Sequence, residues 1–280
     1  MATKIVQSFL PKLIGLRLMT LYKIKPKKTI LKAFKLFCTP RGGFVKAEQK
    51  DFLNAHKSEL VQFKKIKIQT YHWEGKGAKV LLLHGWDSHT FRWKEMVKYL
   101  KTKDYDITAF DAPAHGNSEG NLMNVPIYSE VLNLMLDKYQ PEIVIGHSMG
   151  GMTIIFNQYL KPCQSIKKLV LLGVPSDLNR IMLGFQKILG LSDKFMMVTE
   201  DYFKNRYGYK FQEFSTKDFA KKVNIPSLLI HDKYDKTVPY NEAQDINDAL
   251  KDSELLITEG AGHSLHKVKI YKRILKYIDA

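Results

Sequence analysis

Cysteine is scarce in this sequence: Cys38 and Cys163 are the only two among 280 residues. So few thiols exclude a small secreted domain held together by several disulfides, and their spacing excludes a cysteine-based zinc site. This composition is typical of a reducing compartment, and we therefore expect a cytoplasmic protein.

Long apolar runs are also missing. The most apolar early stretch, Ile5–Tyr22, is interrupted by Pro11, Lys12 and Arg17. A membrane-spanning helix needs about 20 nearly uncharged residues, and a secretory signal needs an unbroken apolar core. We expect neither in this chain.

Acidic residues are nearly absent from the first 50 positions, where Glu48 alone stands against twelve Lys or Arg. Between residues 27 and 37, apolar side chains recur at helical spacing with lysines between them, which predicts an amphipathic helix with a basic face. We therefore assign residues 1–60 to a basic helical N-terminal extension.

Two interpretations of this extension stay open. Its apolar residues pack on the rest of the protein and leave a solvated lysine face, or they make peripheral contact with the inner face of an anionic membrane. We do not expect a nucleic acid partner, because no recognisable nucleic-acid-reading motif accompanies the positive charge.

From about residue 65 the chain alternates short apolar stretches with segments of helical length. The predicted strands are 66–70, 80–83, 107–110, 143–145, 169–172, 228–230 and 255–257. This alternation is typical of a mostly parallel, twisted sheet with helices on both faces, in which ligand sites lie beyond the carboxyl ends of the strands. The first stretch is predicted to be an antiparallel edge hairpin.

The sequence GHSMGG, residues 146–151, places a serine between a predicted strand and a predicted helix. Gly146 to Gly150 fits the pattern G-x-S-x-G, in which a sharp backbone bend lifts the serine oxygen clear of the sheet. The motif alone is a weak signal. Its weight depends on the residues at the ends of the other predicted strands.

Polar residues follow almost every predicted strand. His84 and Gly85 follow the second strand, Asp111 follows the third, Asp235 lies just after the sixth and His263 after the seventh. A serine, an acid and a histidine at successive strand ends, in that chain order, are a strong signal of a hydrolytic triad.

From about residue 65 to its end, the sequence resembles the α/β-hydrolase superfamily. The stretches that carry the resemblance are LLLHGW, AFDAPAHGNS, GHSMGG, LLIHDKYDKTVP and EGAGHS. The resemblance implies an α/β-hydrolase fold, with Ser148 as nucleophile, Asp235 as acid and His263 as base.

Elementary chemistry agrees with these three roles. A serine hydroxyl becomes a good nucleophile when an imidazole accepts its proton, and a carboxylate holds that imidazole in the required tautomer. His263 is favoured over His266, because the small residues 260–262 let its loop fold over the serine. The backbone N–H groups of Trp86 and Met149 are the expected oxyanion donors.

Two positions depart from the family pattern. Asp232 stands where glycine is common, so it competes with Asp235 for the role of acid, although we favour a turn cap or an ion-pair partner. Ala114 also replaces a usual glycine, in a turn where Asp111 and His115 are expected to tie loops together.

Residues 61–280 are therefore assigned to one α/β-hydrolase domain with a small helical lid at about 175–223. Aromatic and methionine residues in this insertion favour an apolar acyl or alcohol group. We predict a serine hydrolase, a carboxylesterase, that cleaves a small-molecule ester through an acyl-enzyme, without metal or organic cofactor.

Two alternatives remain from the sequence. The same triad serves thioesterases and other acyl hydrolases. In a different class of function, proteins with this fold bind a ligand without turning it over, which the presence of all three triad residues disfavours.

Overall fold

The computed structural model describes the backbone of residues 2–280 and the side chains of residues 10–280. Its Cα atoms group into two compact units, a helical unit made of Met1–Thr39 with Asp177–Ser215, and a sheet unit made of Pro40–Ser176 with Thr216–Ala280. Each unit is described by itself.

The sheet unit contains eight strands. They are β1 (Lys57–Phe63), β2 (Ile66–Trp73), β3 (Lys79–Leu83), β4 (Asp106–Phe110), β5 (Ile143–His147), β6 (Lys168–Leu172), β7 (Ser227–Asp232) and β8 (Ser253–Thr258). Its helices are η1 (Ala47–Gln49), α3 (Lys50–Asn54), η2 (Thr90–Trp93), α4 (Lys94–Lys101), α5 (Val125–Tyr139), α6 (Met149–Leu160), α9 (Thr216–Ala220), α10 (Asn241–Ala249) and α11 (Val268–Asp279).

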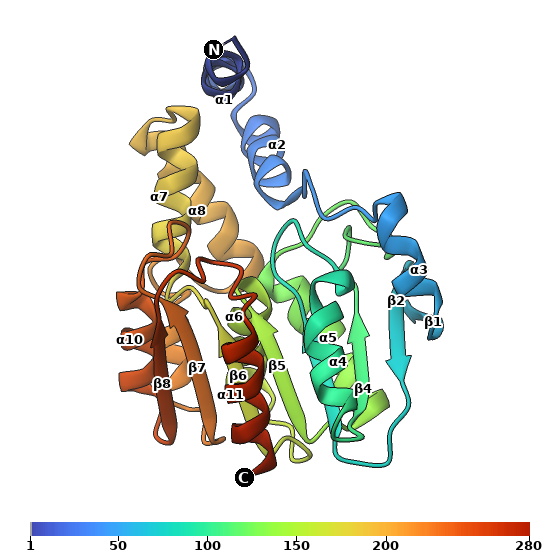
Figure 1. Cartoon of the computed structure of the whole chain (residues 1–280). Helices are drawn as coiled ribbons and strands as arrows, with labels where there is room; N and C mark the ends of the chain where they lie inside the picture. Colours follow the sequence, from blue (N-terminus) through green and yellow to red (C-terminus); the bar gives the residue numbers. More distant parts are fainter. Residues whose placement is uncertain (1) are drawn as a thin grey trace. The chain divides into compact units, whose positions relative to one another are not determined.

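The strands form one sheet in the order β1-β2-β4-β3-β5-β6-β7-β8 (Figure 1). Strands β3 to β8 pair in parallel, whereas β1 with β2 and β2 with β4 pair antiparallel. The predicted fold class, a mostly parallel sheet with an antiparallel edge, is confirmed. All six parallel strands end at the same edge of the sheet, which brings the loops that follow them together.

Helices cover both faces of the sheet. Alternate strand residues such as Leu82 and Ile145 pack with α4 and α11 in one hydrophobic cluster, through Leu100 and Ile274. Their neighbours along the strands, such as Leu81, are also fully buried on the opposite side. Burial on both faces explains why these strands are continuously apolar.

The helical unit consists of α1 (Ala2–Ile24), α2 (Pro26–Cys38), α7 (Leu178–Leu189) and α8 (Asp193–Tyr207). The N-terminal extension was predicted to include residues 40–60, but in the structure these residues lie in the sheet unit. The segment predicted as a lid contributes α7 and α8 to the helical unit and α9 to the sheet unit. Its role as a cover stays a prediction.

Candidate active site

Ser148 lies at a sharp turn between β5 and α6. Its backbone has φ +51° and ψ −120°, a conformation that is strained for any residue other than glycine. A Cβ atom on Gly146 would come within 2.4 Å of Ile154 Cδ1, and one on Gly150 within 2.6 Å of the Leu83 carbonyl oxygen. The two glycines therefore permit the close packing that presents the serine side chain.

Three predicted residues are joined by hydrogen bonds beyond the carboxyl edge of the sheet. His263 Nε2 lies 3.1 Å from Ser148 Oγ, and His263 Nδ1 lies 2.7 Å from Asp235 Oδ2. The Asp235 side chain is fully buried, whereas the His263 side chain is 22% exposed. In this geometry Ser148 can transfer its proton to Nε2 while Nδ1–H donates to the carboxylate.

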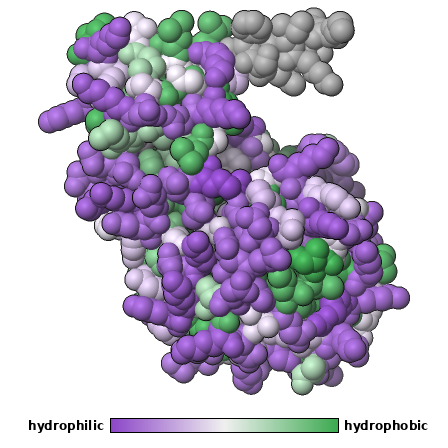
Figure 2. Space-filling model, turned by 90° about the vertical axis from the view of Figure 1, so that its left-hand side faces the viewer, coloured by the Kyte–Doolittle hydropathy of each residue, from purple (hydrophilic) through white to green (hydrophobic). Residues whose placement is uncertain are grey.

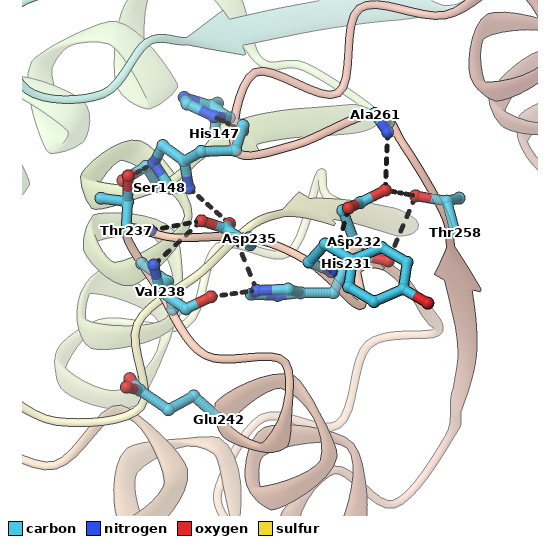
Figure 3. Close-up of polar contacts among 12 residues, drawn as sticks. His147, Ser148, His231, Asp232, Asp235, Thr237, Val238, Glu242, Thr258 and Ala261 are labelled. Carbon is cyan, nitrogen blue, oxygen red and sulfur yellow. Dashed lines mark hydrogen bonds and ion pairs between the residues drawn. The ribbon is translucent and has the colours of Figure 1, made fainter.

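The carboxylate of Asp235 is surrounded by donors (Figure 3). Its Oδ1 accepts from the N–H groups of Thr237 at 2.7 Å and Val238 at 3.0 Å, and its Oδ2 lies 3.4 Å from His231 Nε2. Burial alone would raise the pKa of Asp235, but hydrogen bonds from His231, His263 and these two N–H groups lower it below its usual range. The Asp235 carboxyl group is therefore ionised at neutral pH.

Asp232, the competing acid, faces other partners. Its Oδ1 accepts from the N–H of Tyr234 at 3.1 Å, and its Oδ2 accepts from the N–H of Ala261 at 2.7 Å and the hydroxyl of Thr258 at 3.0 Å. Burial opposes ionisation, but the hydrogen bonds, led by that from Ala261, lower its pKa. The interpretation of Asp232 as a turn cap is confirmed, and Asp235 is the carboxylate that meets His263.

Two further side chains hold the loop that carries His263, and the sequence patterns predicted no role for either. His147 Nε2–H donates to the His263 carbonyl at 2.8 Å, and the Arg92 guanidinium donates to the Ser264 carbonyl at 3.1 Å. Burial, followed by the positive charge of Arg92, lowers the pKa of His147 well below its usual value, so the imidazole is neutral. Together with the bond from Ala261 to Asp232, three side chains hydrogen-bond the backbone of the loop that carries His263.

The loop after β3 lies against Ser148. His84 Nδ1–H donates to the Gly85 carbonyl at 2.7 Å, and His84 Nε2 accepts from the Ala112 N–H at 2.8 Å. Because the peptide unit is planar and trans, this bond turns the Trp86 N–H to the side away from His84. A Cβ atom on Gly85 would lie 3.0 Å from Ser148 Cβ, so this peptide borders Ser148.

Met149 is the first residue of α6, so its N–H has no acceptor within the helix and lies at the positive end of the helix dipole. Met149 and Trp86 thus supply two backbone donors next to Ser148. Their role as oxyanion donors stays a prediction.

The turn after β4 is held by hydrogen bonds of its own. Asp111 accepts from the N–H of Thr90 at 2.8 Å and of Asn117 at 2.9 Å, while His115 Nε2 accepts from the Asp87 N–H at 3.1 Å. These bonds confirm that Asp111 and His115 tie loops together. Ala114, at the second departure from the family pattern, has φ +64°.

Among the residues that the structure describes, no group of three or more His, Cys, Asp or Glu side chains could hold a metal ion.

Two hydrolase families match the chain. The family described as serine aminopeptidase, S33, matches residues 75–199, and the family described as TAP-like protein matches residues 209–278. The first matched segment contains Ser148, and the second contains both Asp235 and His263.

Individual proteins agree with these matches. An uncharacterised hydrolase of Bacillus subtilis is 24% identical over 243 residues, which cover 71% of this chain and 88% of that protein. Monoglyceride lipase of Rattus norvegicus is 33% identical over 92 residues, 29% of this chain and 30% of the lipase. The solved esterase of Exiguobacterium antarcticum has a TM-score of 0.64 at 16% identity, covering 80% of this chain and all of the esterase.

Proposed function

Because this chain belongs to the α/β-hydrolase superfamily, we propose that it is a serine hydrolase that cleaves carboxylic esters of small or apolar acyl groups. The observation that carries the proposal is the continuous hydrogen-bonded series from Ser148 through His263 to the buried Asp235. The expected substrate is a small-molecule ester, and the expected chemistry uses the side chains and backbone of this chain alone.

The proposed reaction proceeds through an acyl-enzyme. Ser148 Oγ attacks the ester carbonyl carbon as its proton passes to His263 Nε2, and Asp235 stabilises the imidazolium. The N–H groups of Trp86 and Met149 stabilise the oxyanion. The imidazolium then protonates the leaving alcohol, and a water molecule activated by the same imidazole hydrolyses the acyl group and restores Ser148.

The choice of an ester rests on the names of the relatives, and the same triad also cleaves thioesters and amides. An esterase and a monoglyceride lipase support ester cleavage, whereas the name of the matched S33 family supports an aminopeptidase. The test is a comparison of kcat/KM for p-nitrophenyl acyl esters of graded chain length, acyl thioesters and amino-acid p-nitroanilides. The proposal requires the esters to be preferred, and a preference for the anilides would assign the protein as a peptidase.

A non-catalytic binding protein is the alternative from another class. Such a protein has no need of a base within hydrogen-bond distance of the serine, whereas His263 Nε2 lies 3.1 Å from Ser148 Oγ. Covalent labelling by a fluorophosphonate separates the two. A protein that stays unlabelled and turns over none of the three substrate classes would be a binding protein.

The first prediction concerns His147 as a positioning residue for His263. His147→Phe keeps an aromatic ring but removes the donor to the His263 carbonyl, so we expect kcat to fall about 10- to 100-fold with KM little changed. His147→Gln can keep an N–H donor and should recover part of that loss. A role limited to stability would lower the melting temperature of both variants and leave kcat of the folded enzymes unchanged.

A further inference from the structure

The apolar side chains of the helical unit fall into two sets, of which the first is buried. Leu18, Ile30 and Phe34 are at most 5% exposed. The ring of Phe34 lies 5.2 Å from that of Tyr202 on α8, between centroids. Phe34 thus packs α2 on α8, and the packing interpretation holds for the buried side chains of Ile30 and Phe34.

The second set is exposed and lies on α1. Leu10, Leu13, Leu16 and Ile24 are 57% to 68% exposed. At 100° per residue their positions fall within about 120° of the helix circumference, and the buried Leu18 lies outside that range. Figure 2 shows that exposed hydrophobic side chains, coloured green, occur among hydrophilic ones, coloured purple, on this face of the molecule. We call these four residues the apolar stripe of α1. The side chains of Ile5, Val6 and Phe9 lie outside the described residues.

Positive charge is concentrated on the same two helices. Residues 1–39 contain nine Lys or Arg and none of the 28 acidic residues of the chain. The exposed lysines of α2, which we call its lysine face, form no ion pair in the described part of the chain; they are Lys27, Lys28, Lys32 and Lys35. Arg17 lies within the angular range of the apolar stripe.

We propose that α1 and α2 bind the surface of anionic lipid bilayers. The apolar stripe of α1 inserts at the boundary between headgroups and acyl chains, and the lysine face of α2 contacts the anionic headgroups. A membrane offers both an apolar layer and negative charge, so it matches both features. A nucleic acid would pair with the lysines and leave the stripe in water, and a second copy of this chain would bring like charges together.

Such binding is peripheral and does not depend on turnover. Among the described residues no helix is long and apolar enough to cross a membrane. The contact should therefore be reversible and weakened by salt, because screening shortens the reach of the lysine charges.

The test is co-sedimentation of the full-length protein with vesicles. We expect sedimentation with phosphatidylcholine vesicles that contain phosphatidylserine, at least about tenfold less with pure phosphatidylcholine, and a marked loss in high salt. The Ser148→Ala variant should sediment like the wild type. A failure of the proposed esterase activity would thus leave this result unaffected, and the reverse also holds.

Matched variants identify the surface. Leu13→Ser/Leu16→Ser and Lys28→Glu/Lys32→Glu should each weaken binding to the acidic vesicles about tenfold or more. Two controls on the sheet unit should bind like the wild type: Leu160→Ser, whose side chain is 54% exposed, and Lys76→Glu/Lys251→Glu, which makes the same change of net charge. All variants should keep the melting temperature and the turnover of a soluble ester.

Three results would overturn the proposal. The wild-type protein stays in the supernatant with acidic vesicles at low salt; or the sheet-unit controls lose as much binding as the α1 and α2 variants; or light scattering shows a dimer that Leu13→Ser/Leu16→Ser dissociates, which would assign the stripe to a second copy. If a variant of α1 unfolds, the lysine pair on α2 still decides the question.

Discussion

Ser148→Ala should abolish covalent labelling by a fluorophosphonate and lower ester turnover by about four to six orders of magnitude. In the proposed mechanism the hydroxyl oxygen of Ser148 forms the bond to the acyl group. Its proton passes to His263 Nε2, which lies 3.1 Å away, and alanine supplies neither the oxygen nor the proton. Alanine is close in size to serine, so the turn should persist. Labelling, measured by intact mass, and hydrolysis of a p-nitrophenyl ester check the expectation.

The controls for this variant lie in the same loops. His263→Ala should reduce turnover to a similar level, because the members of a triad act as a unit. Ser264→Ala removes an exposed hydroxyl beside the histidine and should keep full labelling, since it is the backbone carbonyl of Ser264 that binds Arg92. A Ser148→Ala protein that is still labelled at one site would show that another residue is the nucleophile.

Seven of the eight strands could be predicted from the sequence, and the mostly exposed edge strand β1 could not. Each of the seven predicted stretches lies within one of β2 to β8. Most of these strands carry an apolar run that is typical of parallel strands, whereas the antiparallel β2 begins with apolar and polar residues in alternation. Strand β1, with the sequence KSELVQF, was missed since its residues are mostly exposed and show no apolar pattern. Its pairing with β2 depends on backbone hydrogen bonds, which leave little trace in the side chains.

The hydrogen-bonded positions Ser148, Asp235 and His263 could be predicted because each follows a strand and matches a short local pattern. His147 and Arg92 differ, because their importance comes from contacts with a loop more than 100 residues away. A histidine beside Ser148 was visible in GHSMGG, but nothing local showed that it binds the His263 carbonyl. Arg92 lies in an ordinary basic helical turn and carried no signal at all.

The sequence patterns also did not predict which helices make up the helical unit. The periodicity of α2 predicted an amphipathic helix, but such a pattern does not identify the surface that its apolar face contacts. In the structure Phe34 meets Tyr202, so the buried face packs on α8 of the insertion. Hydrophobic packing is not directional, which is why the partner becomes visible only in three dimensions.

Substitution of Asp235 and of Asp232 should have very different effects on kcat. Asp235→Asn should lower kcat by about three to four orders of magnitude, because an amide cannot both accept from His263 Nδ1–H and stabilise the imidazolium. Asp232→Asn should lower kcat less than about tenfold, yet cost about 1 to 3 kcal/mol of unfolding free energy, since it disturbs buried hydrogen bonds from Ala261 and Thr258. Ester turnover and urea unfolding of both variants measure this contrast.

The pH dependence of stability gives an independent check on the same pair. Both aspartates have a pKa in the folded state that is below the usual value. The stability that they contribute is therefore present above the unfolded-state pKa of about 3.9, and is lost as the pH falls through and below it. Asp232→Asn should make the unfolding free energy fall less steeply at acidic pH, while the hydrogen bond between Asp235 and His263 remains.

A folded Asp232→Asn enzyme that loses more kcat than Asp235→Asn would contradict the assignment of Asp235, and it would make Asp232 the residue that orients His263.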